Sequence, residues 1–146
     1  MAGFEIVPLS SDQAQEWRRL WRDYLAFYET TVGEEVYAAT FARLTDPGVP
    51  EMGAFLAVAE RPVGLVHFIF HRHCWRIEDV CYLQDLYVDP AARGTGAGRA
   101  LMEAVYAEAD RRGCPSVYWT TQHFNHAARA LYDRIGHLTP FIKYVR

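Results

Sequence analysis

The chain has 146 residues, of which 51% are hydrophobic and 23% charged, a balance typical of one folded domain and not of a disordered segment. Its formal net charge of −3 argues against nucleic acid as the main partner, because such binding needs a basic surface. No apolar run approaches the length of a membrane span, and the first residues lack the basic-then-apolar order of a signal peptide. We therefore expect a single domain over residues 1–146, located in the cytoplasm, with neither a nucleic-acid nor a membrane partner.

The first half of the sequence predicts a strand, two helices and a hairpin, in that order. A short apolar run at 4–8 indicates the strand, and apolar residues at helical spacing over 14–28 and 34–44 indicate the helices. The period then changes, since 54–59 and 63–70 are apolar, β-rich runs joined by a short turn that ends in proline.

The second half predicts strands that alternate with helices. We expect a strand at 80–88, a helix at 98–112, a strand at 117–121, a helix at 125–135 and a closing strand at 141–145. The complete order is β-α-α-β-β-β-α-β-α-β, which indicates an α/β fold with a mixed sheet flanked by helices.

A glycine-rich turn joins the strand at 80–88 to the helix at 98–112. The first turn of a helix carries N–H groups without partners inside the helix, and glycines let a phosphate approach this bare backbone. The pattern therefore predicts a pyrophosphate site. A dinucleotide-binding loop would need a third glycine where Arg99 stands, and a nucleoside-triphosphate loop would need Gly-Lys-Ser/Thr, which the sequence lacks. A flexible loop without a ligand is the remaining alternative.

Two motifs resemble the GNAT N-acyltransferase superfamily. Arg93, Gly96 and Gly98 fit the pattern R-x-x-G-x-G, which resembles the acyl-CoA loop of that superfamily. Farther along the chain, Asn125 and Tyr132 lie on one stripe of the predicted helix, in a segment that resembles the second characteristic segment of the same superfamily.

The resemblance extends to one branch of the superfamily and implies a cofactor. The runs 81–89 and 115–120, with the run that ends at Tyr132, resemble the histone, polyamine and D-amino-acid acetyltransferase branch. This implies a GNAT fold in which acetyl-CoA lies where the strands at 80–88 and 117–121 part. The cofactor-binding residues that the resemblance implies are Leu86, Tyr87, Val88, Arg93, Gly94, Thr95, Gly96, Ala97, Gly98, Arg99, Asn125, Ala128 and Tyr132.

The resemblance also implies a mechanism, in which an amine attacks the thioester of acetyl-CoA directly and no residue becomes acylated. Tyr132 matches the superfamily's acid that protonates the leaving thiolate, and Asn125 is expected to hold the cofactor or a bound water. A backbone N–H near Leu86 would lie where the thioester oxygen gains charge. Cys81 and Cys114 are expected to be buried structural thiols and not nucleophiles.

The general base stays open at this point. The attacking amine must lose a proton, and superfamily bases often stand on the strand face shared by Tyr82 and Gln84, neither of which is a carboxylate. Asp85 points to the opposite face of a regular strand, although a bulge can turn it inward. Glu78 and Asp79 are alternatives that would act through water. We expect Asp85 to bind the substrate ammonium, while each carboxylate could equally be solvated or structural.

Histidines and aromatic residues allow further interpretations. His71 and His73 stand two residues apart at a strand end, where two metal ligands could converge, but neither His67 nor another residue supplies an evident third ligand. We therefore expect no metal, and we expect the histidines to line a substrate pocket or to lie on the surface. Five aromatic residues at helical spacing could line an acceptor site or pack in the core: Trp17, Trp21, Tyr24, Phe27 and Tyr28.

The function that these residues predict is transfer of an acetyl group to the primary amine of a small molecule, such as an amino acid or a polyamine. The alternatives are acetylation of protein lysines or N-termini, and a non-catalytic acyl-CoA sensor, which would have no use for Tyr132 and Asn125. About ten residues follow Gly136, where the superfamily often has two strands. A missing strand would leave a sheet edge for a second subunit, so we expect a homodimer or a higher homo-oligomer.

Overall fold

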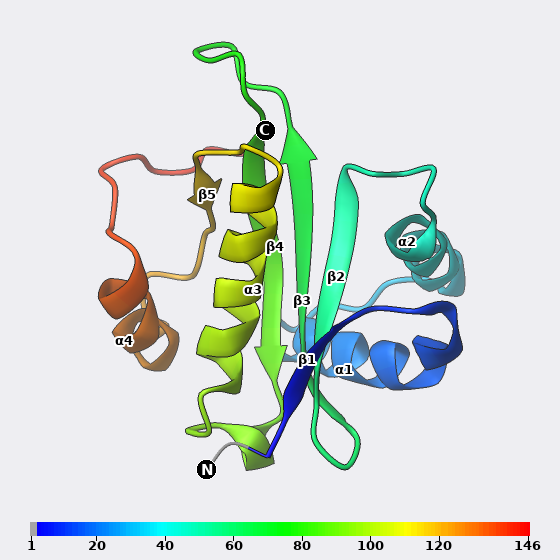
Figure 1. Cartoon of the computed structure of the whole chain (residues 1–146). Coiled ribbons are helices and arrows are strands. Elements are labelled where there is room, and N and C mark those ends of the chain that lie inside the picture. Colours follow the sequence, from blue (N-terminus) through cyan, green and yellow to red (C-terminus); the bar gives the residue numbers. More distant parts are fainter. Residues whose placement is uncertain (1–2) are drawn as a thin grey trace.

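The computed structural model describes residues 3–146 as one five-stranded sheet with helices on both faces (Figure 1). The strands are β1 (Glu5–Pro8), β2 (Met52–Val58), β3 (Pro62–His71), β4 (Val80–Val88) and β5 (Val117–Tyr118), and they lie in this order across the sheet. The helices are α1 (Ala14–Phe27), α2 (Glu34–Thr45), α3 (Ala97–Arg111) and α4 (His126–Ile135). Neighbours from β1 to β4 are antiparallel, whereas β5 runs parallel to β4. This confirms the predicted mixed α/β fold.

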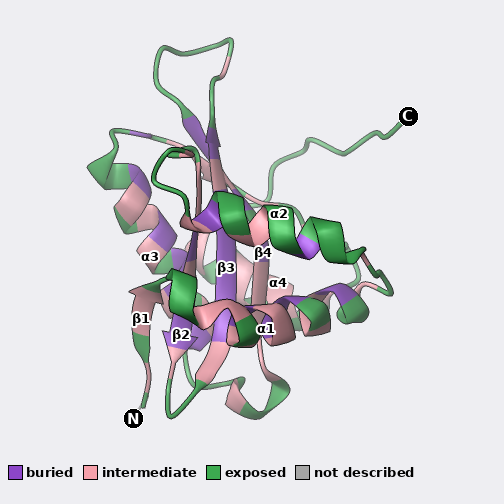
Figure 2. Cartoon of the chain, turned by 90° about the vertical axis from the view of Figure 1, so that its right-hand side faces the viewer, coloured by how far each residue is buried: buried purple, intermediate pink, exposed green. Residues whose placement is uncertain are grey.

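The core has two parts, one on each face of the sheet. Helices α1 and α2 cover one face, as Figure 2 shows, and α3 covers the other. The apolar stripes predicted for the helices are the buried ones: α1 buries Trp17 and Leu20, and α3 buries Leu101, Met102 and Val105. Because β2 and β3 lie between the two layers, their side chains are buried on both sides of the sheet.

A bulge in β4 changes which face its side chains point to. His67 of β3 lies opposite Asp85, whereas the next residue of β3 lies opposite Leu83, so Gln84 is left without a partner. Leu83 before the bulge and Leu86 after it therefore both pack in the core under α3. The bulge turns Asp85 toward α1, and the inward orientation considered for this residue is confirmed.

Strands β4 and β5 touch only at one end. Cys81 pairs with Val117 and Tyr82 with Tyr118, and no further pair between these strands follows in the part of the chain that the structure describes. Beyond these pairs the two strands part, and the edge of β4 down to Val88 is left open on the side of α4 (Figure 1). The parting expected between these strands is confirmed.

The C-terminal part of the chain corrects two predictions. The strand expected at 117–121 ends at Tyr118, and residues 141–145 form no strand. The physical reason is that a strand needs a partner for its backbone N–H and C=O groups, and the short β5 offers almost no edge. The segment that follows α4 leaves several large apolar side chains exposed: Leu138, Phe141, Ile142, Tyr144 and Val145. The other predicted elements are present with bounds close to those expected.

Candidate active site

The start of α3 is open to an anion. Gly94 and Gly96 have φ of 79° and 89°, in the left-handed region that favours glycine. No side chain of residues 3–146 caps this helix, and its first backbone bond runs from the N–H of Ala100 to the carbonyl of Gly96 at 3.0 Å. The N–H groups of residues 97–99 are therefore free of partners within the helix, and the helix dipole favours a negative charge beside them.

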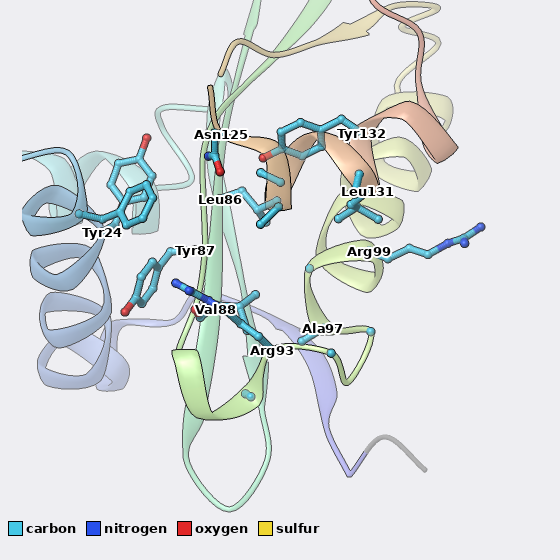
Figure 3. A pocket seen from close by; sticks show the side chains of 18 of the residues that line it. Tyr24, Leu86, Tyr87, Val88, Arg93, Ala97, Arg99, Asn125, Leu131 and Tyr132 are labelled. Carbon is cyan, nitrogen blue, oxygen red and sulfur yellow. Dashed lines mark hydrogen bonds between the residues drawn. The ribbon is translucent and has the colours of Figure 1, made fainter. Parts of the chain in front are cut away.

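A cavity of about 600 Å³ lies between this loop, the open edge of β4 and α4 (Figure 3). All of the cofactor-binding residues predicted from the sequence except Thr95 line it: Leu86, Tyr87, Val88, Arg93, Gly94, Gly96, Ala97, Gly98, Arg99, Asn125, Ala128 and Tyr132. The Thr95 hydroxyl instead donates to the carbonyl of Ala92 at 2.6 Å and holds the turn. Leu131 also lines the cavity, and sequence reasoning missed it because an apolar residue on a helix indicates only core packing.

Tyr132 and Asn125 approach each other over Leu86. Figure 3 shows the Tyr132 hydroxyl directed toward Asn125 across the cavity. The amide of Asn125 donates to the Thr121 hydroxyl at 3.4 Å. Burial raises the pKa of Tyr132 to about 12, so its hydroxyl keeps its proton at neutral pH and can donate a hydrogen bond.

A second cavity, of about 380 Å³, adjoins the first. Tyr24 and Tyr28 line both cavities. The other residues of the second cavity are Tyr82, Gln84, Asp85, Thr120, Thr121, Gln122 and Lys143. The aromatic residues of the first helix were expected either to line an acceptor site or to pack in the core, and each interpretation holds for some of them. Trp17 and Trp21 are buried in the core, whereas Tyr24, Phe27 and Tyr28 line cavities.

Asp85 is a buried carboxylate beside the second cavity. Its residue is 7% exposed, and its Oδ2 accepts hydrogen bonds from His67 Nδ1 at 2.8 Å and from Trp21 Nε1 at 3.1 Å. Burial raises the pKa of Asp85, but the hydrogen bonds from His67, Tyr24 and Trp21 outweigh it and leave the pKa below its ordinary value. Asp85 is therefore ionised at neutral pH.

His67 corrects the prediction that it lines a pocket or lies on the surface. It is buried, with 4% of its surface exposed, and its Nε2 accepts a hydrogen bond from Trp17 Nε1 at 2.9 Å. His71 lies apart from it and contacts the Tyr118 hydroxyl at 2.8 Å. Within residues 3–146 no three histidine, cysteine, aspartate or glutamate side chains are grouped to hold a metal ion.

Two other predicted groups lie outside the cavities. Glu78 is exposed in the connection before β4 and lines neither cavity. Cys81 and Cys114 are buried, and burial raises the pKa of Cys81 to about 12, which fits the structural role expected of this thiol.

Comparisons with known proteins agree with this geometry. The model of the acetyltransferase (GNAT) family matches residues 15–137. The D-amino-acid N-acetyltransferase HPA3 of Saccharomyces cerevisiae is 41% identical over 143 residues, which are 97% of this chain and 89% of the yeast protein.

Solved structures share the fold at lower identity. AAC(6')-Iy in complex with a CoA bisubstrate analogue superimposes with a TM-score of 0.86 at 16% identity, over 98% of this chain and 97% of the other. A ribosomal-protein-alanine N-acetyltransferase from Brucella melitensis biovar Abortus 2308 gives a TM-score of 0.81 at 20% identity, over 98% and 97% of the two chains.

None of the helices described for residues 3–146 combines the length and the apolar character that a membrane crossing requires. The resemblance stated from Arg93, Gly96, Asn125 and Tyr132 is confirmed by the family match and by the yeast relative. This chain belongs to the GNAT family of N-acetyltransferases, which use acetyl-CoA.

Proposed function

We propose that this chain, with residues 1–146 acting as one domain, transfers the acetyl group of acetyl-CoA to the primary amine of a small molecule. The observation that carries the proposal is the meeting of two cavities at Tyr24 and Tyr28. One contains the free amides of α3, and the other contains the buried carboxylate of Asp85. The second cavity, of about 380 Å³, suits a small acceptor better than a protein segment, which would need a long groove.

The proposal is tested by thiol release from acetyl-CoA with amino acids, polyamines and a lysine-containing peptide as acceptors. We expect turnover with one of the small amines and little with the peptide. Turnover with the peptide alone would favour protein acetylation. Tight binding of CoA without turnover on any amine would favour the sensor.

Each part of the first cavity has a proposed role toward the cofactor. The N–H groups of residues 97–99 bind the diphosphate, and Arg93 and Arg99 add positive charge beside it. The open edge of β4 pairs with the pantetheine arm as an added strand would. A backbone N–H near Leu86 donates to the thioester oxygen as it gains charge during the attack.

The proposed reaction forms a C–N bond and breaks the C–S bond of the thioester. The ammonium of the acceptor binds Asp85 and must release a proton before it attacks. Because the pKa of Asp85 is lowered, its carboxylate is a weak base, and we assign it to binding while the proton leaves through water. The nitrogen loses a second proton to water once the C–N bond has formed, and the departing thiolate of CoA takes up one proton from water. The exposed position of Glu78 gives it no proposed role.

Tyr132→Phe lowers kcat by about tenfold to a hundredfold, the value of one hydrogen bond to a charged group, and leaves the Kd of CoA almost unchanged. The hydroxyl has a pKa of about 12, whereas a thiol has a pKa of about 8.5, so complete proton transfer to the thiolate costs about 5 kcal/mol. Tyr132 therefore acts by donating a hydrogen bond to the departing sulfur. Thiol release and calorimetry measure the two effects.

Tyr106→Phe is the matched control for this variant. It removes a hydroxyl that donates to the carbonyl of Ile135 at 3.0 Å, away from both cavities, and we expect it to leave kcat unchanged. Equal losses of kcat and of CoA affinity in Tyr132→Phe would contradict the role in thiolate departure.

Within small amines, we propose an amino acid as the acceptor. Asp85 and Lys143 line the same cavity with opposite charges, which match the ammonium and the carboxylate of an amino acid. The name of the yeast relative, a D-amino-acid N-acetyltransferase, supports this choice. Lys143→Met raises the KM of an amino acid by about threefold to tenfold, because an exposed charge pair is weak. The KM of the corresponding amine without a carboxylate stays the same, and an equal rise for both acceptors would count against this role.

We also propose that the protein is a homodimer, in which a second copy covers the apolar side chains of residues 138–145. These side chains are exposed, and the two-residue β5 is the outer strand of the sheet at this end. Analytical ultracentrifugation is expected to give a dimer for the full chain and a monomer after deletion of residues 138–146. A full-length monomer would refute the proposal. The cytoplasmic location stays a prediction from the sequence.

A further inference from the structure

Four buried side chains form a hydrogen-bonded chain that crosses from α1 to β4. Trp17 Nε1 of α1 donates to His67 Nε2 of β3 at 2.9 Å. His67 Nδ1 lies 2.8 Å from Asp85 Oδ2 of β4, and Trp21 Nε1 donates to the same oxygen at 3.1 Å. All four residues are less than one tenth exposed, so these bonds are shielded from water and from competing partners.

Trp17 determines which nitrogen of His67 carries the proton. An indole N–H can only donate, so Nε2 of His67 must accept with its lone pair, and the proton of the neutral ring lies on Nδ1. Nδ1 then donates to Asp85. A second proton on Nε2 would meet the Trp17 N–H at 2.9 Å, donor against donor.

The state of His67 decides how much charge the second cavity presents. Asp85 beside a neutral imidazole leaves a net charge of −1, whereas Asp85 beside an imidazolium leaves none. His67 and Trp21 both donate to Oδ2, and Tyr24 also hydrogen-bonds Asp85. The carboxylate lines the cavity, where its Oδ1 accepts from neither His67 nor Trp21. An ammonium ligand gains from the full charge, because attraction is strong where water is excluded.

The other titratable side chains that face Asp85 do not set the charge beside the second cavity in the way that His67 does. Tyr24 and Tyr28 come from α1 and its end, and Tyr82 comes from β4. Burial raises the pKa of Tyr24 and of Tyr28, so both are uncharged at neutral pH. Lys143 lines the same cavity from the C-terminal segment.

We propose that His67 is a positioning residue, held in its Nδ1–H form by Trp17, so that it orients Asp85 by donating to Oδ2 and leaves the His67–Asp85 pair with a net charge of −1 for the ammonium of the acceptor. The inference rests on the proposed function only for the acceptor, since the Trp17–His67–Asp85 arrangement itself is independent of catalysis.

Trp17→Phe is the direct test, because it removes the N–H and leaves an aromatic ring in the core. His67 Nε2 is then free to take a proton. We expect the KM of the amine to be near the wild-type value at about pH 8 and about tenfold higher at about pH 6, while kcat and the KM of acetyl-CoA stay the same. A pH profile identical to that of the wild type, or a KM raised equally at both pH values, would overturn the inference.

Trp21→Phe is the matched control. It removes a donor to Asp85 and leaves the Trp17–His67 contact intact, so we expect a KM for the amine that is raised to the same extent at both pH values. A new dependence on pH in this variant as well would also count against the role of Trp17.

A second pair of variants keeps the inference testable if Trp17→Phe does not fold. His67→Asn places an amide N–H near the position of Nδ1, whereas His67→Gln places its amide near Nε2 and gives Asp85 no donor. We expect His67→Asn to retain the KM of the amine and His67→Gln to raise it about tenfold. Equal KM values for the two variants would contradict the inference.

Nitrogen-15 NMR of the imidazole separates this inference from the proposed function, because it needs no substrate. We expect a proton on Nδ1 and none on Nε2 in the wild type, and a second proton in Trp17→Phe at a pH at which the wild type has none. A proton on Nε2 of the wild-type ring would overturn the inference. If the spectra are as expected but the KM of the amine does not change with the protonation of His67, the binding of the ammonium by Asp85 is refuted instead.

Discussion

Asp85→Asn lowers kcat/KM for the amine about a hundredfold or more, which corresponds to about 2.7 kcal/mol. The wild-type carboxylate lies at the side of the second cavity, with Oδ2 bound to His67 and Trp21. An amide in its place carries no charge to attract an ammonium. We expect most of the loss in the KM of the amine. Initial rates at several amine concentrations measure it, and calorimetry is expected to find the CoA affinity unchanged.

Asparagine is the informative substitution because it keeps the shape of the side chain. Its oxygen can accept the bonds from His67 and Trp21, whereas Asp85→Ala would leave two buried donors without a partner. Asp89→Asn is the matched control. Asp89 contacts Arg19 at 3.2 Å and lines neither cavity, so its loss is expected to spare the KM. An equal effect of the two variants would show that Asp85 does not bind the acceptor.

The charge on Asp85 also makes the stability of the protein depend on pH. Its pKa is lower in the folded protein than the ordinary value of 3.8. The ionised carboxylate therefore stabilises the fold above that value, and this contribution is lost as the pH falls through the folded pKa. Chemical denaturation is expected to find Asp85→Asn less stable than the wild type at neutral pH, with a smaller difference in acid. A constant difference would argue against the lowered pKa.

The sequence predicts those parts of the site whose signals are local. The glycine turn before α3 could be predicted because glycine is the residue that favours positive φ, which Gly94 and Gly96 adopt. The helix that follows it also has a clear apolar stripe. The same holds for Tyr132, whose position on α4 follows from helical spacing. These features depend on neighbours within a few turns of the chain, and the sequence contains those neighbours in order.

The parts that were missed depend on contacts between distant segments. The run 141–145 has the apolar character of a strand, but the edge it would pair with ends at Tyr118, which no local pattern could show. The partnership of His67 with Asp85 depends on the register of β3 against β4 and on the bulge between them. A histidine opposite an aspartate in a predicted antiparallel pair was the available signal, and only the register makes it visible.

Gly98→Val lowers the affinity for CoA about a hundredfold and leaves the fold intact. A Cβ at Gly98 would lie 3.7 Å from both Val88 of β4 and Leu131 of α4, two residues that line the first cavity. The added methyl groups would therefore occupy the space between them. Gly98 lies in the first turn of α3 and has no positive φ. In a helix, valine is more favourable than glycine by about 0.3 kcal/mol. Calorimetry with CoA and thermal unfolding measure the two effects.

Two comparisons separate the blocked cavity from a damaged helix. Ala107→Val also creates a valine, at an exposed position of α3, and we expect normal CoA binding. Gly96→Ala places a side chain at a φ of 89° and is expected to cost about 1–2 kcal/mol of stability. The two glycines of the loop should thus differ, since Gly96 is needed for the shape of the backbone and Gly98 for the space beside it. If Gly98→Val bound CoA as the wild type does, the diphosphate could not lie against the first turn of α3.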